Sequence, residues 1–350
     1  MSVPAEGTTA TEAAAPVDAA ADGLARRIGT VVLRQDVLLL AIFVLMVAMF
    51  SAVNPRFFSL PAATNVLQDF SPVVLMAIGE SFVIITGGID ISVGSVLGLA
   101  GVVMALVIRT LNAGGFSPTA AIIAGLAAAI GVGLLVGLLN GLLIARGRIV
   151  PFVATLATMG AAAGMSVVIT GGVQIAGAPH QVIMFGNAQY FGALTVPVIA
   201  VFVMTAVAWT VLSKTRFGRW TYAIGSSPFA ARAVGIDVQR HLIKVYAIAG
   251  VLAALAGAFV YFRLGSGSPL SGRGGELSAI AAAVIGGIGL QGGVGRLTGT
   301  VLGALITTAV LSGLILIGVE PNWQQIVVAA LIAVAVGVQG FGGIAGMTAR

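Results

Sequence analysis

Few side chains in this sequence could do chemistry in an apolar setting, and the clearest are carboxylates. Glu80 and Asp69 fall in or near one long apolar stretch, and Glu276 opens another. An ionisable group inside a membrane is costly and marks a functional candidate. A proton or sodium relay uses several such groups at mid-depth. We expect Asp69 and Glu276 near the outer face, and Glu80 at a helix break or solvated near the cytoplasmic end, which argues against ion-coupled transport.

Other reactive patterns are absent from the sequence. It has no cysteine, and its two histidines, His180 and His241, are far apart and without acidic neighbours in sequence. No paired carboxylates or Ser/His/Asp spacing is visible, and no G-x-x-x-x-G-K-[ST] run could cradle a phosphate. We therefore expect no catalytic residue, metal ligand or cofactor site, and an energy source on another chain if transport is active.

Two glycine-rich runs interrupt the apolar stretches, GGIDISVGS at 87–95 and GGIGLQGGVGR at 286–296. Glycine releases a helix, and Asp90 could cap the helix that follows it. Paired breaks at matching positions are typical of transporters built from repeats, where broken helices line the route. The alternative is two ordinary turns that need glycine. The candidate residues for this pathway are Gly87, Gly88, Asp90, Ser92, Gly94, Gly286, Gly287 and Gly292.

The composition places these motifs in a membrane. Of 350 residues, 59% are hydrophobic and 8% are charged, whereas soluble domains carry about 25% charged residues. The apolar runs are continuous for about 20 residues, which indicates helices rather than a barrel. We predict an all-α polytopic membrane protein with about ten spans and broken or re-entrant segments. The expected spans are 37–53, 62–86, 91–110, 118–145, 151–170, 195–213, 245–263, 276–290, 298–318 and 323–340.

Basic residues orient these spans. With the N-terminus inside, thirteen of the seventeen Lys and Arg residues fall on the cytoplasmic side, including Arg26, Arg27, Arg34 and Arg350. Both termini are then predicted to be cytoplasmic. Residues 1–30, rich in Ala, Thr and Pro, are predicted to be a disordered tail rather than a signal peptide. Residues 31–345 are predicted to form one transmembrane domain.

Small residues recur along one face of the span at 118–145. Gly133, Gly137 and Gly141 are spaced by four residues, which lets a neighbouring backbone come close. The alternative is that glycine is simply frequent in transmembrane helices.

The segment 214–244 holds six of the seventeen Lys and Arg residues between two apolar runs. Within it, a serine followed by Pro228 predicts the start of a short helix, and Gly235 predicts its end. Its apolar face suits a groove on a partner protein; the alternative is a solvated loop that only sets orientation. The predicted coupling residues are Gly225, Ser227, Pro228, Phe229, Ala230, Ala231, Arg232, Gly235 and Ile236.

Several motifs in order resemble the permease subunits of ribose, xylose and galactoside ABC importers. They are the runs at 87–95, 141–156, 215–219 with 235–236, and 276–287, within a likeness covering about 37–340. The tail before residue 30 departs from that family, and branched-chain amino-acid permeases are more distant relatives. In the family, the loop matching 225–236 is the coupling helix.

The resemblance implies a monosaccharide importer subunit in the inner membrane of a bacterium. It implies a homodimer, an ABC ATPase subunit that binds the ATP and magnesium, and an extracytoplasmic sugar-binding protein, with no cofactor on this chain and no nucleic acid. An ion-coupled transporter or a channel acting alone is the alternative. A membrane enzyme has little support.

Overall fold

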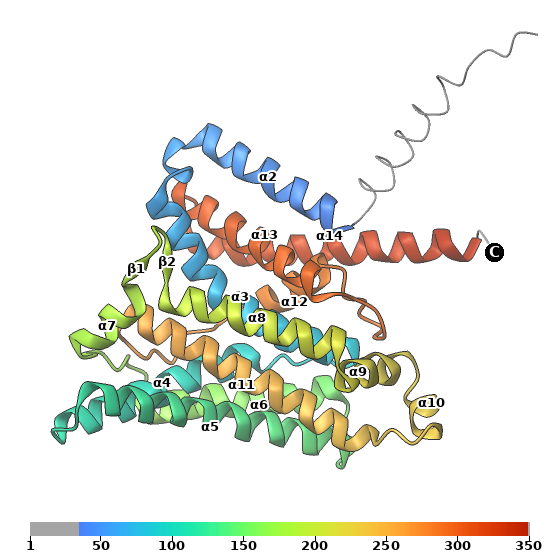
Figure 1. Ribbon diagram of the computed structural model, residues 1–350, viewed down its shortest axis with the longest axis horizontal. Coiled ribbons are helices and arrows are strands. Elements are labelled where there is room, and N and C mark those ends of the chain that lie inside the picture. The colour runs from blue at the N-terminus through green and yellow to red at the C-terminus, as the bar shows by residue number, and fades with distance from the viewer. Residues whose placement is uncertain (1–34, 349–350) are drawn as a thin grey trace, which may run out of the picture.

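The computed structural model describes residues 35–348, and the predicted tail at 1–30 lies outside them with Arg34 and Arg350. The chain runs through helices and one short hairpin (Figure 1). Its elements are α2 (Gln35–Val53), η1 (Pro55–Phe57), α3 (Leu60–Ile85), α4 (Val93–Ala113), α5 (Pro118–Ala145), α6 (Pro151–Thr170), α7 (His180–Asn187), β1 (Gln189–Tyr190), β2 (Leu194–Thr195), α8 (Val196–Lys214), α9 (Arg216–Ser226), α10 (Pro228–Ala233), α11 (Val238–Leu264), α12 (Gly275–Ile285), α13 (Leu297–Leu316) and α14 (Pro321–Thr348).

Each of the ten predicted spans corresponds to one apolar helix. Within the described residues, eight helices are long and apolar enough to cross a membrane, and two shorter apolar helices, Gly275–Ile285 and Asn322–Gly337, match the remaining predictions. The polytopic helical fold is thereby confirmed. The eighth prediction, 276–290, needs correction because α12 has 11 residues, about 16 Å of helix. That is about half of a hydrocarbon core of about 30 Å.

Serine caps and prolines define where many of these helices begin. Ser59, Ser117 and Ser227 each accept a hydrogen bond from a backbone N–H in the first turn of the helix that follows. Each of those helices also has proline in its first two positions, where the missing N–H costs nothing. The starts of these three helices are therefore determined by residues that are neighbours in the sequence.

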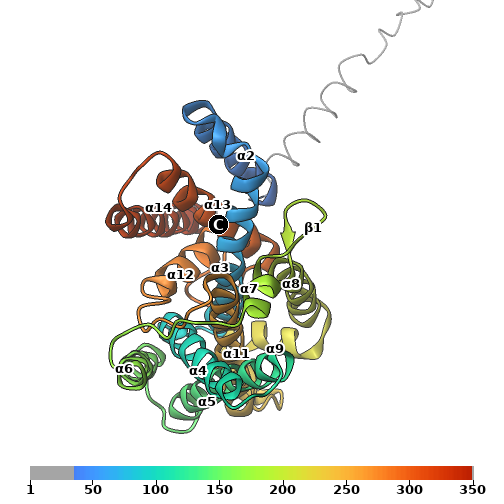
Figure 2. The same cartoon turned by 90° about the vertical axis from the view of Figure 1, so that its left-hand side faces the viewer.

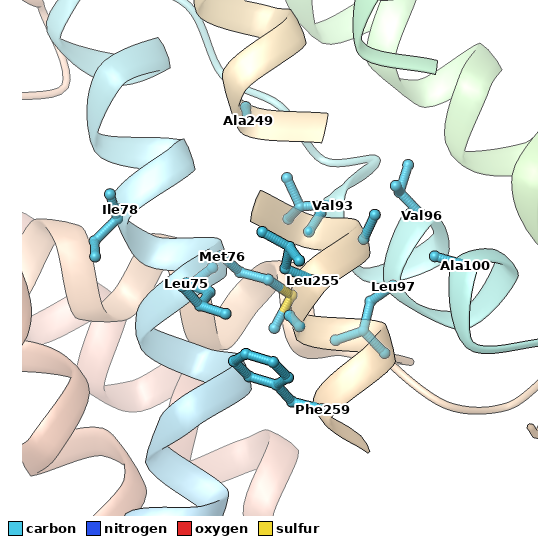
Figure 3. Packing of buried hydrophobic residues seen from close by; sticks show 14 of the residues in the cluster. Leu75, Met76, Ile78, Val93, Val96, Leu97, Ala100, Ala249, Leu255 and Phe259 are labelled. Atoms are coloured by element: carbon cyan, nitrogen blue, oxygen red, sulfur yellow. The ribbon is translucent and has the colours of Figure 1, made fainter. Parts of the chain in front are cut away.

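The core is built around α11, which packs against α3, α4 and α5. Figure 3 shows side chains of α3, α4 and α11, among them Met76, Leu97 and Phe259, meeting in one cluster. On the other side of α11, a Cβ on Gly133 or Gly137 would overlap the backbone of α11. The predicted close packing along this glycine face is confirmed, and it brings α5 and α11 into backbone contact.

The bundle has two different ends. Figure 1 shows α9 and α10 at the same end as the start of α2 and the end of α14, with α7 and the hairpin at the opposite end. The end-on view in Figure 2 places α2, α13 and α14 on one side of α3, and α4, α5 and α6 on the other. The hairpin is antiparallel, with Gln189 opposite Thr195. The segment 214–244, predicted as a basic loop, is mostly helical, because α9, α10 and the start of α11 lie in it.

Candidate functional site

The short helix predicted after Ser227 is present as α10. The Ser227 side chain accepts a hydrogen bond from the N–H of Ala230 at 3.2 Å, and Pro228 takes the first helical position. The helix ends at Ala233, and Gly235 follows with a φ of +84°, a conformation that glycine adopts without strain. The start and stop signals read from the sequence are confirmed.

The two faces of α10 differ. Phe229 is 82% exposed and Val234 is 76% exposed, whereas Ala231 is 3% exposed and packs against Ile224 and Val238. Ala230 and Arg232 are exposed as well. Phe229 and Val234 thus give α10 an exposed apolar face. Ala231 lies on the inner face, where it holds α10 against α9 and α11.

A groove of about 600 Å³ runs beside α10. One wall is the turn between α5 and α6 with Arg148, and the other includes Arg232, Asp237 and the half-buried Ile236. The sequence placed these basic residues on one side of the membrane but gave no sign that the two segments face each other. The groove therefore brings Arg148 of the α5–α6 turn and Arg232 of α10 to the same place.

The helix α9 connects α10 to the interior. A Cβ on Gly225 would overlap the carbonyl oxygen of Ile85 and would lie 2.5 Å from the backbone nitrogen of Gly293. The Tyr222 hydroxyl donates to the carbonyl of Gly295 at 2.8 Å. Burial raises the pKa of Tyr222, and the charge of Arg296 partly offsets that rise. The last turns of α9 therefore contact the end of α3 and the second glycine-rich break.

The two breaks themselves lie together. The N–H of Gly293 donates to the carbonyl of Ile85 at 2.8 Å, and a Cβ on Gly292 would lie 2.9 Å from the backbone nitrogen of Gly87. Gly286 packs instead on Gly299 of α13, and Gly287 forms a turn with a φ of +86°. We call the contact of Ile85, Gly87, Gly225, Gly292 and Gly293 the glycine junction. Nothing in the sequence showed that these distant positions meet.

The first break carries a buried hydrogen-bond network. The carboxylate of Asp90 accepts from the N–H of Ser92 at 2.9 Å and from its hydroxyl at 2.5 Å. Asn140 donates to the Ser92 hydroxyl at 3.0 Å and accepts from Thr158 at 2.7 Å. Burial raises the pKa of Asp90, and its hydrogen bonds to Ser92 and Asn140 counteract that rise. The network joins the break to α5 and α6.

Two expectations for this region are corrected. Asp90 accepts from Ser92, the residue before α4, and makes no side-chain cap to the N–H groups of that helix. Glu80 is fully buried rather than solvated, and its carboxylate accepts from the N–H of Asp90 at 3.1 Å. Its second oxygen and the hydroxyl of Tyr246 have no hydrogen-bond partner within the described residues. Gly88 packs directly against that hydroxyl.

The carboxylate predicted near the outer face behaves differently. Asp69 of α3 forms an ion pair with Arg263 of α11. The side-chain amide of Gln68 donates to the side chain of Asn187, which donates to the carbonyl of Arg263. These hydrogen bonds attach α7 to α3 and α11. These contacts join α3, α7 and α11 at the end of the bundle opposite α10.

Sequence reasoning missed the segment 265–274, which joins α11 to α12. Instead of crossing the end of the bundle, it runs back along α4: Gly267 packs on Val102, and Gly272 packs on Gly94. The step of eight residues from Gly94 to Val102 corresponds to about 12 Å along the axis of α4. Irregular backbone at such depth occurs where it is buried in protein or lines a cavity. The available signal was its sequence, GSGSPLSGRGG at 265–275, which is rich in glycine and serine.

Comparisons with known proteins agree on the class of molecule. A family model described as branched-chain amino acid transport system / permease component matches residues 62–336. A ribose import permease protein of Bacillus subtilis is 42% identical over 299 residues, 85% of this chain and 90% of the relative. A D-allose transport system permease protein of Escherichia coli is 35% identical, with 84% and 88% covered. A galactose/methyl galactoside import permease protein of Haemophilus influenzae is 33% identical, with 87% and 94% covered.

Proposed function

From the premise that this chain belongs to the family of branched-chain amino acid transport system permease components, we propose that it carries a monosaccharide through a bacterial inner membrane. The observation that carries the sugar assignment is that relatives matched over most of their length are named for ribose, allose and galactose. The resemblance to sugar ABC importer permeases seen in the sequence is confirmed. In this proposal a second copy completes the pathway, a binding protein delivers the sugar, and a separate ATPase supplies the energy.

The geometry of α10 supports the ATPase as the partner at that end. A short capped helix with exposed Phe229 and Val234 suits insertion into a cleft. Beside it, the groove offers Arg148 and Arg232 for polar contacts at the rim. This end of the bundle, with the start of α2 and the end of α14, is the cytoplasmic one in the proposal.

Movement of α10 passes inward through α9. Ala231 packs α10 onto Ile224 of α9, and one residue further along Gly225 contacts the glycine junction. Because backbone atoms meet there with no side chain between them, a shift of α9 displaces the end of α3 and the second glycine-rich run. In the proposal, those displacements open and close the pathway at the cytoplasmic end.

The test uses the absence of cysteine from the chain, which allows single thiols to be placed at will. Phe229→Cys in the assembled complex is expected to cross-link to the ATPase subunit with a short bifunctional reagent. The control is Phe191→Cys, since Phe191 is 92% exposed in the hairpin at the opposite end. Capture of the ATPase from Phe191→Cys, and not from Phe229→Cys, would reverse the orientation and reject the coupling role of α10.

The same complex tests the substrate class. In proteoliposomes with the ATPase and the loaded binding protein, uptake of labelled ribose, allose or galactose is expected only when ATP is present. Uptake by this chain alone, driven by an ion gradient or by diffusion, would favour the alternative of a transporter that needs no ATPase.

A further inference from the structure

A pocket of about 220 Å³ lies where the re-entrant segment 265–274 faces α6. One water needs about 10–15 Å³ of such space, so the pocket has room for a small polar ligand. The pocket lies beside the start of α4, because its walls include Ser95 in the first turn of α4 and Glu276 in the first turn of the half-length α12. It opens on the side of the chain, where Gly160, Leu270 and Arg273 are exposed. The rest of the lining includes the flexible side chain of Met159 and the polar side chains of Ser166, Ser271 and Arg273.

The lining offers hydrogen bonds from several directions. Ser95, Ser166 and Ser271 come from three separate parts of the chain, and a serine hydroxyl can both donate and accept. The Ser166 hydroxyl donates to the carbonyl of Ala162 at 2.9 Å, so it offers the pocket an acceptor. Arg273 adds donors and Glu276 adds acceptors. Within the described residues, Arg273 and Glu276 do not form an ion pair with each other. The Glu276 carboxylate already accepts from the backbone N–H groups of Gly274 and Glu276, whereas Arg273 is an exposed part of the lining.

The α6 side of the pocket is open because of glycine. A Cβ on Gly160 would meet no heavy atom within 4 Å. Met159 and Leu270 supply apolar surface near the hydroxyls. Mixed polar and apolar walls of this kind suit a ring whose edges carry hydroxyls and whose faces carry C–H groups.

We propose that this pocket is a transit site for one neutral monosaccharide, held by the three serine hydroxyls with Arg273 and Glu276. The proposal rests on the proposed function and adds a place where the sugar stops. A sugar hydroxyl is donor and acceptor at once, so it can be matched by serine, by guanidinium and by carboxylate in turn. The half-length helix α12 and the re-entrant segment exist, in this view, to admit polar cargo to this depth.

A free amino acid is the competing cargo, since Arg273 and Glu276 carry opposite charges. Two observations favour the sugar. Backbone N–H groups of Gly274 and Glu276 donate to the Glu276 carboxylate, which leaves it less able to serve an ammonium group. The three serine hydroxyls have no counterpart on the aliphatic side chain of such a ligand. L-Leucine is accordingly included as a second cargo in the test.

The experiment fills the pocket from α6 in the assembled, reconstituted complex. The series Gly160→Ala, Gly160→Val and Gly160→Leu is expected to lower uptake of the transported sugar in steps, with Gly160→Leu about tenfold or more below the wild type, a loss of about 1.4 kcal/mol or more. Hydrolysis of ATP and assembly are expected to stay within about twofold. Gly131→Leu is the matched control, because a Cβ on Gly131 also meets nothing within 4 Å and Gly131 is not part of the pocket lining.

Each outcome either supports or overturns the proposed transit site. Uptake in Gly160→Leu equal to wild type overturns the pocket while leaving the importer intact. A wild-type complex that carries L-leucine and none of ribose, allose or galactose overturns both the pocket assignment and the proposed function. If Gly160→Leu fails to assemble, Ser271→Ala with Glu276→Gln replaces it, since neither change adds bulk. A raised KM for sugar uptake with unchanged ATP hydrolysis supports the site, and an unchanged KM rejects it.

Discussion

The two glycine-rich breaks have similar sequences but different surroundings. At the first, Asp90 and Ser92 are buried and bonded through Asn140 to α5 and α6. At the second, backbone groups make the contacts: Gly293 donates to Ile85, and Gly295 accepts from Tyr222 of α9. The first break is held on several sides by side chains, whereas the second is held by backbone and by the helix that leads to α10.

This difference indicates different roles. A buried hydrogen-bond network is costly to disrupt, so the first break fixes the ends of α3 and α4 relative to α5 and α6. The second break is bonded to α9, which leads to α10, the helix proposed to contact the ATPase. We therefore assign the first break to the static part of the molecule and the second to the part that α10 moves. The glycine junction is where the two meet.

The largest effect on stability is expected from the first break. Asn140→Leu removes the amide that bonds Ser92 and Thr158, and unpaired buried groups cost about 1–3 kcal/mol. The free energy of unfolding in detergent should fall by that amount, with a lower Tm. Asn112→Leu, at the exposed end of α4, is the control and should change stability by about 0.5 kcal/mol or less. Equal losses of stability in both variants would show that the buried network at the first break stabilises the protein no more than an exposed asparagine does.

A smaller effect is expected at the second break. Tyr222→Phe removes the hydrogen bond to Gly295, worth about 0.5–1.5 kcal/mol. Because this contact joins α9 to the break, sugar uptake should fall by about threefold, and more than ATP hydrolysis does. Tyr190→Phe, in the hairpin at the other end, is the control. A drop in stability with uptake per ATP unchanged would make Tyr222 structural only.

Local signals in the sequence predicted local structure well. Ser227, Pro228 and Gly235 define α10 through capping and backbone conformation, which depend on neighbouring residues alone. The spans followed from continuous apolar runs, and the spacing of Gly133, Gly137 and Gly141 predicted close packing without naming α11 as the partner. Each of these depends on a property that a short stretch carries by itself.

What the sequence could not predict depends on contacts between distant segments. Gly87 and Gly292 are far apart in the chain, and their contact follows from how α3 and α12 pack. The burial of Glu80 likewise depends on its neighbours in space. The spans predicted at 245–263 and 276–290 leave 264–275 as a simple connection, because glycine and serine are common in ordinary loops as well as in re-entrant segments. Its depth is visible only in its contacts with Gly94 and Val102.

The measurement that tests the role of α9 most directly is uptake per ATP hydrolysed in the Gly225→Ala complex. A single methyl there would overlap the carbonyl of Ile85, whereas the same change at Gly131 meets open space. We predict that Gly225→Ala assembles and hydrolyses ATP but imports about tenfold less sugar per ATP, while Gly131→Ala matches the wild type. Wild-type import per ATP in Gly225→Ala would contradict the transmission of movement from α10 through α9 to the glycine junction.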